Sequence, residues 1–434
     1  MRRRLGPLLA RTLLVALAVM VIAAALLWWF GVRDALEPSV VAGAVSAQAP
    51  QPRQAASVAA GAYLARAGNC KGCHTRRGGA EYAGGRAIET PFGVVHSSNL
   101  TPDALTGIGA WSAADFWRAM HHGRSRDGRL LVPAFPYANT TRVLREDSDA
   151  LFAFLMSRAA VEQANPAPAL RWPFGTQPAL ALWRALYFRA AIWRPDAARS
   201  PAWNRGAYLV GGLGHCSACH SSRNAWGAED TERQVGGMVQ GWYAPSLLHA
   251  GEAGLGDWDE RDIVALLRTG VGARASVSGP MAEVVLHGTQ YLSNPDLSAV
   301  AVYLRSMQTG SPRVTKSSAP LGLGSAAGSR LYEKHCANCH GDSGEGVSGA
   351  YPALAGNRAV LMGDSRNLVQ MVLRGGFAPA TDGNPRPFGM PPYQVLLSDG
   401  DIAAVLTHIR GAWGNSAAAL SELDVARHRG GPLR

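Results

Sequence analysis

The sequence predicts an all-α protein in which three small helical domains stand in tandem behind one N-terminal transmembrane helix. Three observations lead to this prediction: a long uncharged stretch near the N-terminus, one cysteine and histidine motif that occurs at three places, and helix-like segments that recur around each motif. The 434 residues allow about two to four domains. Because 47% of them are hydrophobic and only 17% are charged, the chain can bury cores and is not disordered.

The uncharged stretch runs from Thr12 to Val32, and its 21 residues (32 − 12 + 1) are enough to cross a bilayer as a helix. By the positive-inside rule, the arginines before it keep the N-terminus in the cytoplasm and send the rest of the chain across the membrane. We therefore predict a membrane anchor at residues 1–33. A cleaved signal peptide is the alternative, since Ala47 and Ala49 could form a cleavage site. The arginines are Arg2, Arg3, Arg4 and Arg11.

The net charge of +11 is spread along the chain. Almost all of it comes from arginine, because only Lys71, Lys316 and Lys334 are lysines. The basic residues are scattered and do not gather into a run that would follow a nucleic acid backbone. We expect neither DNA nor RNA as a partner.

All six cysteines belong to one motif, Cys-x-x-Cys-His, which is the attachment signature of c-type haem. The two thiols, one helical turn apart, add to the haem vinyl groups as thioethers, and the adjacent histidine becomes the proximal ligand of the iron. The sequence therefore predicts three covalent haem c groups and their proximal iron ligands. The motif residues are Cys70, Cys73 and His74, then Cys216, Cys219 and His220, and finally Cys336, Cys339 and His340.

Other roles for paired cysteines fit less well. A zinc ribbon needs a second pair in the same domain, and a dithiol redox site needs a thioredoxin-like context. Neither is visible in the sequence. Disulfides are common in exported chains, but the histidine that follows every pair argues against them.

Each motif opens a similar module, and the motifs are offset by 146 (216 − 70) and 120 (336 − 216) residues, as in a tandem array. A helix-like segment leads into each motif, at Gly61, Gly206 and Gly328. A helix that ends in glycine follows, at 111–123, 258–270 and 366–375, and a closing helix comes last, at 148–158, 296–307 and 401–409. Asn294, Pro295 and Ser398 are the expected N-terminal capping residues.

These segments set the predicted domain bounds. The haem domains are expected at 55–160, 203–307 and 327–415. A connector rich in Trp and Pro lies at 161–202, a flexible linker at 308–326 and a loosely ordered tail at 416–434. Within the connector, residues 179–189 could form an amphipathic helix with Trp183, Leu186 and Tyr187 on one face. This face is expected to touch a membrane or a partner, or alternatively to pack across the haem domains.

Each module resembles the class I cytochrome c fold, in which the first and last helices cross and the sixth iron ligand, usually Met, comes from a loop before the last helix. This resemblance implies Met281 for the second haem and Met390 for the third, at 61 (281 − 220) and 50 (390 − 340) residues past the proximal histidines. A Met ligand raises the haem potential and is typical of an electron carrier. Core packing suits Met156, Met307, Met362 and Met371 better, because they lie on helical patterns.

The first module departs from this pattern. The position 61 residues past His74 is Phe135, which cannot ligate iron. The remaining candidates for the sixth ligand are Met120, or instead His121 or His122, at the end of the helix that should lie on the distal face. An open, five-coordinate iron is the other possibility, and the coordination decides whether this haem is a carrier or a catalyst.

The chain also resembles the membrane-bound, three-haem cytochrome subunits of bacterial periplasmic dehydrogenases, which act on alcohols, gluconate, aldehydes or nicotinate. The resemblance covers residues 55 to about 415, and its most specific pieces are Asn204–Val210, Gly241–Pro245, Gly279–Val285 and Gln290–Leu292. In the alcohol and gluconate type a Met stands where this chain has Phe135. The chain is therefore more similar to the branch that pairs with molybdenum-containing aldehyde or N-heterocycle dehydrogenases.

The resemblance implies electron relay at the bacterial inner membrane, with the haem domains facing the periplasm. A catalytic subunit of the molybdenum, flavin or quinone type would oxidise the substrate, and the haems would pass electrons to membrane quinone or a terminal oxidase. The sequence contains none of the motifs GxGxxG, P-loop, HExxH or GxSxG, so we expect no catalytic residues in this chain. The alternative is a haem enzyme, peroxidase-like or sulfur-oxidising, that uses an open first haem. A haem-based sensor would need an effector domain, for which no residues are left.

Overall fold

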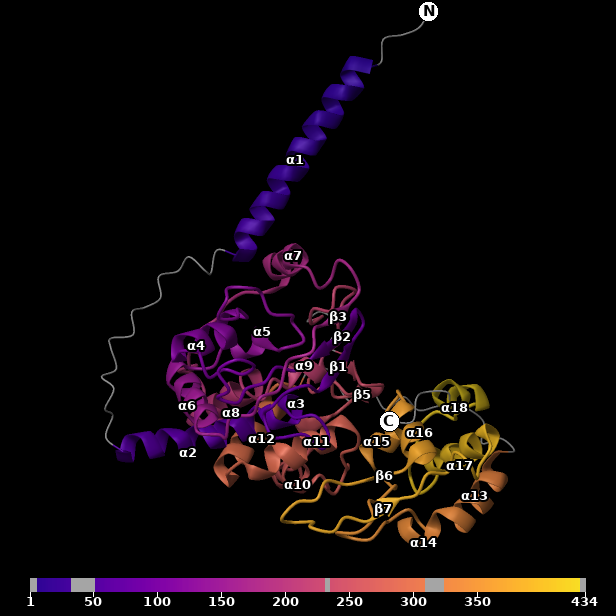
Figure 1. Ribbon diagram of the computed structural model, residues 1–434. Coiled ribbons are helices and arrows are strands. Elements are labelled where there is room, and N and C mark those ends of the chain that lie inside the picture. Colours follow the sequence, from indigo (N-terminus) through magenta and orange to yellow (C-terminus); the bar gives the residue numbers. More distant parts are fainter. Residues whose placement is uncertain (1–5, 33–50, 231–234, 309–323, 430–434) are drawn as a thin grey trace, which may run out of the picture. The chain divides into compact units, whose positions relative to one another are not determined.

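The computed structural model describes residues 6–32, 51–230, 235–308 and 324–429, shown as ribbon in Figure 1. Two compact units are distinguished: the first comprises residues 1–62 and 73–193, and the second comprises residues 63–72 and 194–434. Within the described residues there are 18 α-helices and seven strands of two to four residues. The predicted helix-rich fold is confirmed, although the short strands were not expected. The tandem of three haem domains stays a prediction.

The first unit contains the N-terminal helix, Cys73 and His74 of the first motif and most of the connector. Its strands β1 (Ala87–Thr90), β2 (Gly93–His96) and β3 (Ala169–Leu170) form one antiparallel sheet in that order. Two helices, α2 and α3, cross the division between the units. The helices that lie wholly or partly in the first unit are α1 (Gly6–Val32), α2 (Gln51–Ala67), α3 (Cys70–His74), α4 (Ala113–His122), α5 (Tyr137–Thr140), α6 (Arg145–Met156) and α7 (Gln177–Tyr187).

The second unit contains the second and third motifs, each with its own hydrophobic core. Two hairpins are formed by β4 (Gly237–Val239) with β5 (Trp242–Ala244), and by β6 (Gly376–Phe377) with β7 (Gly389–Met390). The helices around the second motif are α8 (Pro201–Gly211), α9 (Ser217–His220), α10 (Glu260–Thr269), α11 (Pro280–His287) and α12 (Asn294–Ser306), with 3₁₀ turns at Leu255–Asp257 and Thr289–Tyr291. Those around the third are α13 (Gly324–His335), α14 (Ala337–His340), α15 (Arg358–Leu361), α16 (Arg366–Arg374), α17 (Asp399–Gly411) and α18 (Glu422–Arg429).

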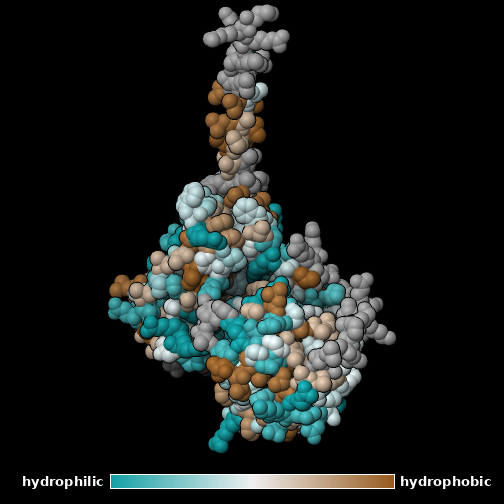
Figure 2. Space-filling model, turned by 90° about the vertical axis from the view of Figure 1, so that its right-hand side faces the viewer, coloured by the Kyte–Doolittle hydropathy of each residue, from teal (hydrophilic) through white to brown (hydrophobic). Residues whose placement is uncertain are grey.

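The helix α1 covers the uncharged stretch of the sequence. Its described side chains are exposed, for example Leu13 at 67% and Trp29 at 52%, and Figure 2 shows apolar surface along it. Among the described residues, no helix is both long and apolar enough to cross a membrane. The predicted transmembrane helix is therefore not supported. The arginines at positions 2–4 and the cleavage-site candidates Ala47 and Ala49 lie outside the described residues.

The helix that leads into each motif crosses the closing helix of the same module at a glycine. A Cβ on Gly61 in α2 would lie 1.9 Å from the carbonyl oxygen of Ala150 in α6. Equivalent close approaches occur at Gly206 in α8 and at Gly328 in α13, where a Cβ would lie 2.0 Å and 2.3 Å from a carbonyl oxygen of α12 and α17. Only glycine allows backbones to come this close. The sequence shows these glycines, but only the packing explains them.

Capping side chains set the starts of the helices that carry or face the sites. Ser398 caps α17, as the sequence predicts, and the structure adds a reciprocal capping box with Asp401. At α12 the cap is Ser293, one residue before the predicted Asn294, and Pro295 occupies the first turn. Ser112 caps α4 in the same way as Ser398 caps α17.

A partly buried ion pair joins two helices of the second unit, and a hydrogen bond adds the end of α2 that belongs to the same unit. Arg205 in α8 donates to both carboxylate oxygens of Asp296 in α12, at 2.8 and 2.9 Å, and the Tyr63 hydroxyl of α2 donates to the same carboxylate at 2.5 Å. Burial raises the pKa of Asp296, but the hydrogen bonds from Arg205 and Tyr63 outweigh it and leave the pKa below its ordinary value.

Replacing this carboxylate should weaken the second unit. We expect Asp296→Asn to lower its free energy of unfolding by about 2 kcal/mol at pH 7, because a hydrogen bond to a charged group contributes about 1.5–3 kcal/mol. Since the folded pKa is depressed, the contribution is present above the ordinary value of about 3.9 and is lost as pH falls through the folded value. Urea unfolding at several pH values measures this, with the exposed Asp257→Asn as control. A difference that does not shrink in acid contradicts the prediction.

The C-terminal tail is ordered over α18, so the prediction of loose order is wrong for this part. Val425 is fully buried in the core that also contains Ile402 and Leu406 of α17. Arg429 pairs with the Asp399 carboxylate and donates to the carbonyl of Leu397. The helix α18 is held by one buried valine and one ion pair, and two single contacts form no periodic pattern that could be recognised in the sequence. The predicted linker at 308–326 lies largely outside the described residues.

Candidate functional site

Each of the three motifs folds into a single helical turn that ends at its histidine. The first motif is the helix α3 itself, while α9 and α14 begin one residue after the first cysteine of their motifs. Residues three apart on a helix lie on the same side, so the two cysteines of a motif face the same way. This is the arrangement that thioether attachment of a haem needs.

The Nδ1 atom of every motif histidine contacts a backbone carbonyl oxygen. Because a carbonyl oxygen can only accept, Nδ1 carries the proton and Nε2 keeps its lone pair. An imidazole whose Nδ1–H is fixed in this way is oriented to bind a metal through Nε2. Burial also lowers the pKa of all three histidines, which favours the neutral form that a metal ligand needs. The contacts are His74 to Ser98 at 2.7 Å, His220 to Pro245 at 2.6 Å and His340 to Pro352 at 3.0 Å.

The state of the cysteines disfavours the other roles considered for them. All six lie in the part of the chain that the structure describes, and none of them forms a disulfide. Burial raises the pKa of Cys216 to about 12 and that of Cys336 to about 11, so both are neutral thiols at pH 7. A dithiol redox site works through a cysteine whose pKa is lowered, not raised.

The third module contains a cavity of about 120 Å³ that brings two predicted iron ligands together. His340 and Cys336 line it from the motif, and Met390 lines it as well. The sequence predicted a loop at Met390, but the residue lies in the strand β7. The pairing of β7 with β6 holds the backbone of Met390 in place. The rest of the lining is mostly apolar and includes Leu354, Leu368, Met371, Val372, Tyr393 and Leu406.

In the second module, one strand connects the proximal histidine with the segment that carries the predicted Met ligand. The carbonyl of Pro245, which holds His220, directly follows β5. At the other end of β5, the Trp242 ring packs on Gly279, where a Cβ would lie 2.6 Å from the ring. Met281 follows two residues later, in the first turn of α11, where a loop was predicted.

In the first module, the candidates for the sixth ligand lie at the C-terminal end of α4. Met120 and His121 are both buried, at 8% and 6% exposed. The Met120 carbonyl accepts a hydrogen bond from Thr140, and the His121 ring stacks on Trp117 at 4.4 Å. Burial suits a core residue as well as an iron ligand, so the choice among Met120, His121 and His122 stays open.

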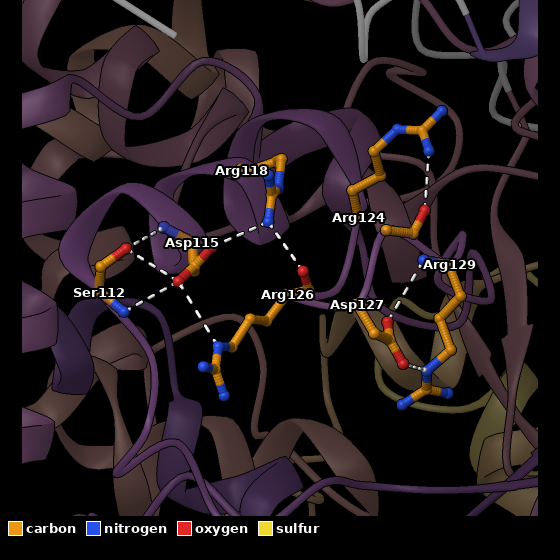
Figure 3. A network of polar contacts seen from close by, with 8 residues as sticks. Ser112, Asp115, Arg118, Arg124, Arg126, Asp127 and Arg129 are labelled. Atoms are coloured by element: carbon orange, nitrogen blue, oxygen red, sulfur yellow. Dashed lines mark hydrogen bonds and ion pairs between the residues drawn. The ribbon is translucent and has the colours of Figure 1, made fainter. Parts of the chain in front are cut away.

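Polar contacts hold both ends of this helix, as Figure 3 shows. The Ser112 hydroxyl accepts from the Asp115 backbone, and the Asp115 carboxylate accepts from Ser112 in return. The same carboxylate pairs with Arg118 at 2.8 Å and with Arg126 at 4.0 Å. The turn after α4 is therefore tied back to its first residues, which fixes the helix that carries the candidate ligands.

Sequence reasoning missed Arg184, the buried cation of the connector helix α7. It is 2% exposed, donates to the His122 carbonyl, and stacks near the rings of Tyr137 and Phe188, at 5.5 and 4.5 Å. A cation suits this place because the carbonyls at a helix C-terminus carry partial negative charge. The connector thus supports the end of α4. The buried face of α7 contains Leu180, Ala181 and Arg184, whereas the predicted face contains Leu186, which is 49% exposed.

The residues present fit a covalently attached haem. Cysteines on one face of a turn, a neutral histidine fixed through Nδ1 and an apolar cavity with a thioether among its lining residues are the donor set of a Met/His haem. These features define the class of c-type cytochromes. Among the described residues, no group of three or more His, Cys, Asp or Glu side chains could hold a metal ion by itself.

Comparisons with known proteins agree with this class. The family model "Cytochrome c" matches residues 325–413. The chain is 37% identical over 90% of its length to the cytochrome c subunit of alcohol dehydrogenase (quinone) of Gluconacetobacter polyoxogenes, of which it covers 88%. It is also 37% identical over 90% of its length to the gluconate 2-dehydrogenase cytochrome c subunit of Pantoea cypripedii, of which it covers 94%.

A third relative is much longer than this chain. It is a nicotinate dehydrogenase subunit of Pseudomonas putida, 42% identical over 82% of this chain, which spans only 30% of that protein. Taken together, the matches show that the chain belongs to the family of cytochrome c subunits of dehydrogenase complexes. Membership of this family implies electron transfer with haem c.

Proposed function

We propose that the chain carries three haems c and relays electrons from the catalytic subunit of a periplasmic dehydrogenase to membrane quinone or a terminal oxidase. The observation that carries this proposal is the cavity of the third module, where His340 and Met390 line one apolar space. A His/Met donor pair raises the potential and leaves no site for a substrate on the iron, as a carrier needs. The haem supplies the one-electron chemistry, and the protein sets its position and potential.

The residues of the chain have separate tasks in this relay. The motif cysteines attach the groups, so that none is lost when the oxidation state changes. The carbonyls of Ser98, Pro245 and Pro352 keep each proximal histidine in the tautomer that binds iron. Apolar residues such as Leu354 and Leu406 exclude water from the third site, which disfavours the extra positive charge of the oxidised state.

The number of haems can be tested motif by motif. We expect the intact mass and the haem absorbance of the purified chain to correspond to three haems. Each double substitution, Cys70→Ser/Cys73→Ser, Cys216→Ser/Cys219→Ser or Cys336→Ser/Cys339→Ser, should lower that number by one, because a thioether cannot form without the thiol. A double substitution that leaves the haem content unchanged contradicts attachment at that motif.

The proposed partner is a catalytic subunit of the molybdenum, flavin or quinone type that oxidises an alcohol, an aldehyde or an N-heterocycle. Support comes from the relatives, which are named as subunits of alcohol, gluconate and nicotinate dehydrogenases. Purification of the tagged chain in mild detergent, followed by mass spectrometry, tests this. A stoichiometric dehydrogenase that reduces the haems when its substrate is added supports the relay, and a cytochrome that purifies alone contradicts it.

The alternative function depends on the first module. Phe135 stands where a Met ligand was expected and cannot bind iron, so an open iron with peroxidase-like or sulfur-oxidising activity is the second candidate. Carbon monoxide binding to the reduced chain separates the two functions. A six-coordinate first haem with Met120, His121 or His122 resists it, whereas an open first haem binds it rapidly.

We also propose that the haem domains lie on the periplasmic side of the bacterial inner membrane. The support is the order of the sequence, with four arginines before the uncharged stretch from Thr12 to Val32. Fractionation of cells, followed by N-terminal sequencing, tests this. Recovery of the chain with the cytoplasm contradicts export, while a mature chain that begins after Ala49 contradicts the anchor and supports a signal peptide.

A further inference from the structure

The segment that leads into the first haem motif packs on the second module. Residues 63–72 belong to the second unit, and we call residues 63–70 the lead segment. The Tyr63 hydroxyl donates to Asp296, and the Arg66 guanidinium lies 4.5 Å from the centre of the Tyr291 ring. A Cβ on Gly288 would lie 3.0 Å from the Arg66 carbonyl oxygen. The lead segment is therefore held against the second module at several points.

One hydrogen bond joins the lead segment to the residue that precedes the second motif. His215 Nε2 lies 3.3 Å from the carbonyl oxygen of Gly68. The carbonyl can only accept, so His215 donates through Nε2–H. The backbone of His215 has φ = 36°, in the left-handed region that Asn also adopts readily. The position is thus held by a hydrogen bond on one side and by an uncommon backbone conformation on the other.

This hydrogen bond lies between two attachment cysteines. Consecutive Cα atoms are about 3.8 Å apart, so Gly68 is within about 7.6 Å of Cys70, and His215 is about 3.8 Å from Cys216. A Cβ on Gly68 would lie 3.4 Å from Cys70 Sγ and 3.5 Å from the carbonyl oxygen of Leu213. The sulfur of the first motif and the backbone just before the second motif therefore border the same small space.

We propose that the Gly68 to His215 contact is the bridge through which the first and second haems exchange electrons, and that His215 is its positioning residue. The bonded route runs from Cys70 back to the Gly68 carbonyl, across the hydrogen bond into the imidazole of His215, and on to Cys216. The inference rests on the proposed function, because it needs a haem at both motifs. One electron passes from ferrous to ferric iron; no bond forms or breaks, and no proton or other reactant is required.

The test variant is His215→Asn in the full chain with its haems attached. Asn accepts the left-handed backbone but is too short to replace the ring in this contact. The haems are photoreduced with less than one electron per chain, and the redistribution of that electron is followed in the visible absorption bands. The phase that involves the first haem is the one missing from the Cys70→Ser/Cys73→Ser chain. We expect His215→Asn to slow this phase by about tenfold or more, as substitutions of outer partners do at metal sites.

The matched control is His249→Asn, the same chemical change in the same unit but away from the cysteine motifs in the sequence. It should leave the phase unchanged. Both variants must first show three haems by mass, with midpoint potentials like those of the unmodified chain, so that a merely structural loss is not mistaken for a loss of coupling.

The outcomes separate the inference from the function on which it rests. A slowed phase in His215→Asn with full haem content supports the bridge. An unchanged phase with full haem content overturns the bridge and leaves the relay intact. Absence of haem at the first or second motif of the unmodified chain overturns the proposed function itself.

Discussion

Met390→Leu is expected to lower the midpoint potential of the third haem by at least about 0.1 V, a small part of the roughly 0.8 V range that axial ligands span. The thioether of Met opposite a histidine raises the potential, and leucine cannot ligate iron. Because leucine and Met have similar volumes, the core cost is below about 1.5 kcal/mol. A potentiometric titration followed in the visible bands, together with the sulfur to iron charge-transfer absorption, measures the change.

The third module offers its own control for this experiment. Met371 in α16 lines the same cavity as Met390 but lies on the helix that packs into the core. Met371→Leu should leave the potential and the charge-transfer absorption unchanged. If Met371→Leu lowers the potential and Met390→Leu does not, the ligand is misassigned, and the strand pair β6 and β7 has only a structural role.

The helices around the motifs were largely predictable because their determinants are local, whereas α11 and α18 were not expected. The apolar periodicity of 366–375 reappears as α16, and Ser398 caps α17 as its sequence context indicates. The motifs were predictable for the same reason, since five consecutive residues contain the whole attachment chemistry. Local signals of this kind survive in a single sequence.

Features that depend on contacts between distant residues were not predictable. Arg184 is in a helix that the sequence indicates, yet its burial depends on a carbonyl 62 residues away, at His122. The placement of residues 63–70 on the second module depends on contacts such as Tyr63 with Asp296. No periodicity encodes such a pair.

Gly206→Ala should have the largest effect on stability of any single methyl group in the second module. The added Cβ would lie 2.0 Å from the Ala299 carbonyl oxygen in α12. Backbone atoms cannot turn away as a side chain does, so α8 and α12 must separate. We expect a loss of about 3 kcal/mol in the free energy of unfolding, at the upper end of what overpacking costs. Denaturant unfolding followed by far-ultraviolet circular dichroism measures it.

Gly211→Ala in the same helix gives the opposite sign, which makes the pair informative. Apart from the neighbouring turn of its own helix, no described atom lies within 4 Å of the Cβ that would be added there. Only the helix preference of alanine then acts, and stability should rise by up to about 1 kcal/mol. A common effect of both substitutions would mean that helix propensity, not the crossing, dominates. If only Gly206→Ala destabilises, the close crossing of the first and last helices stabilises the module. Alanine at Gly61 or Gly328 should then destabilise the first or third module in the same way.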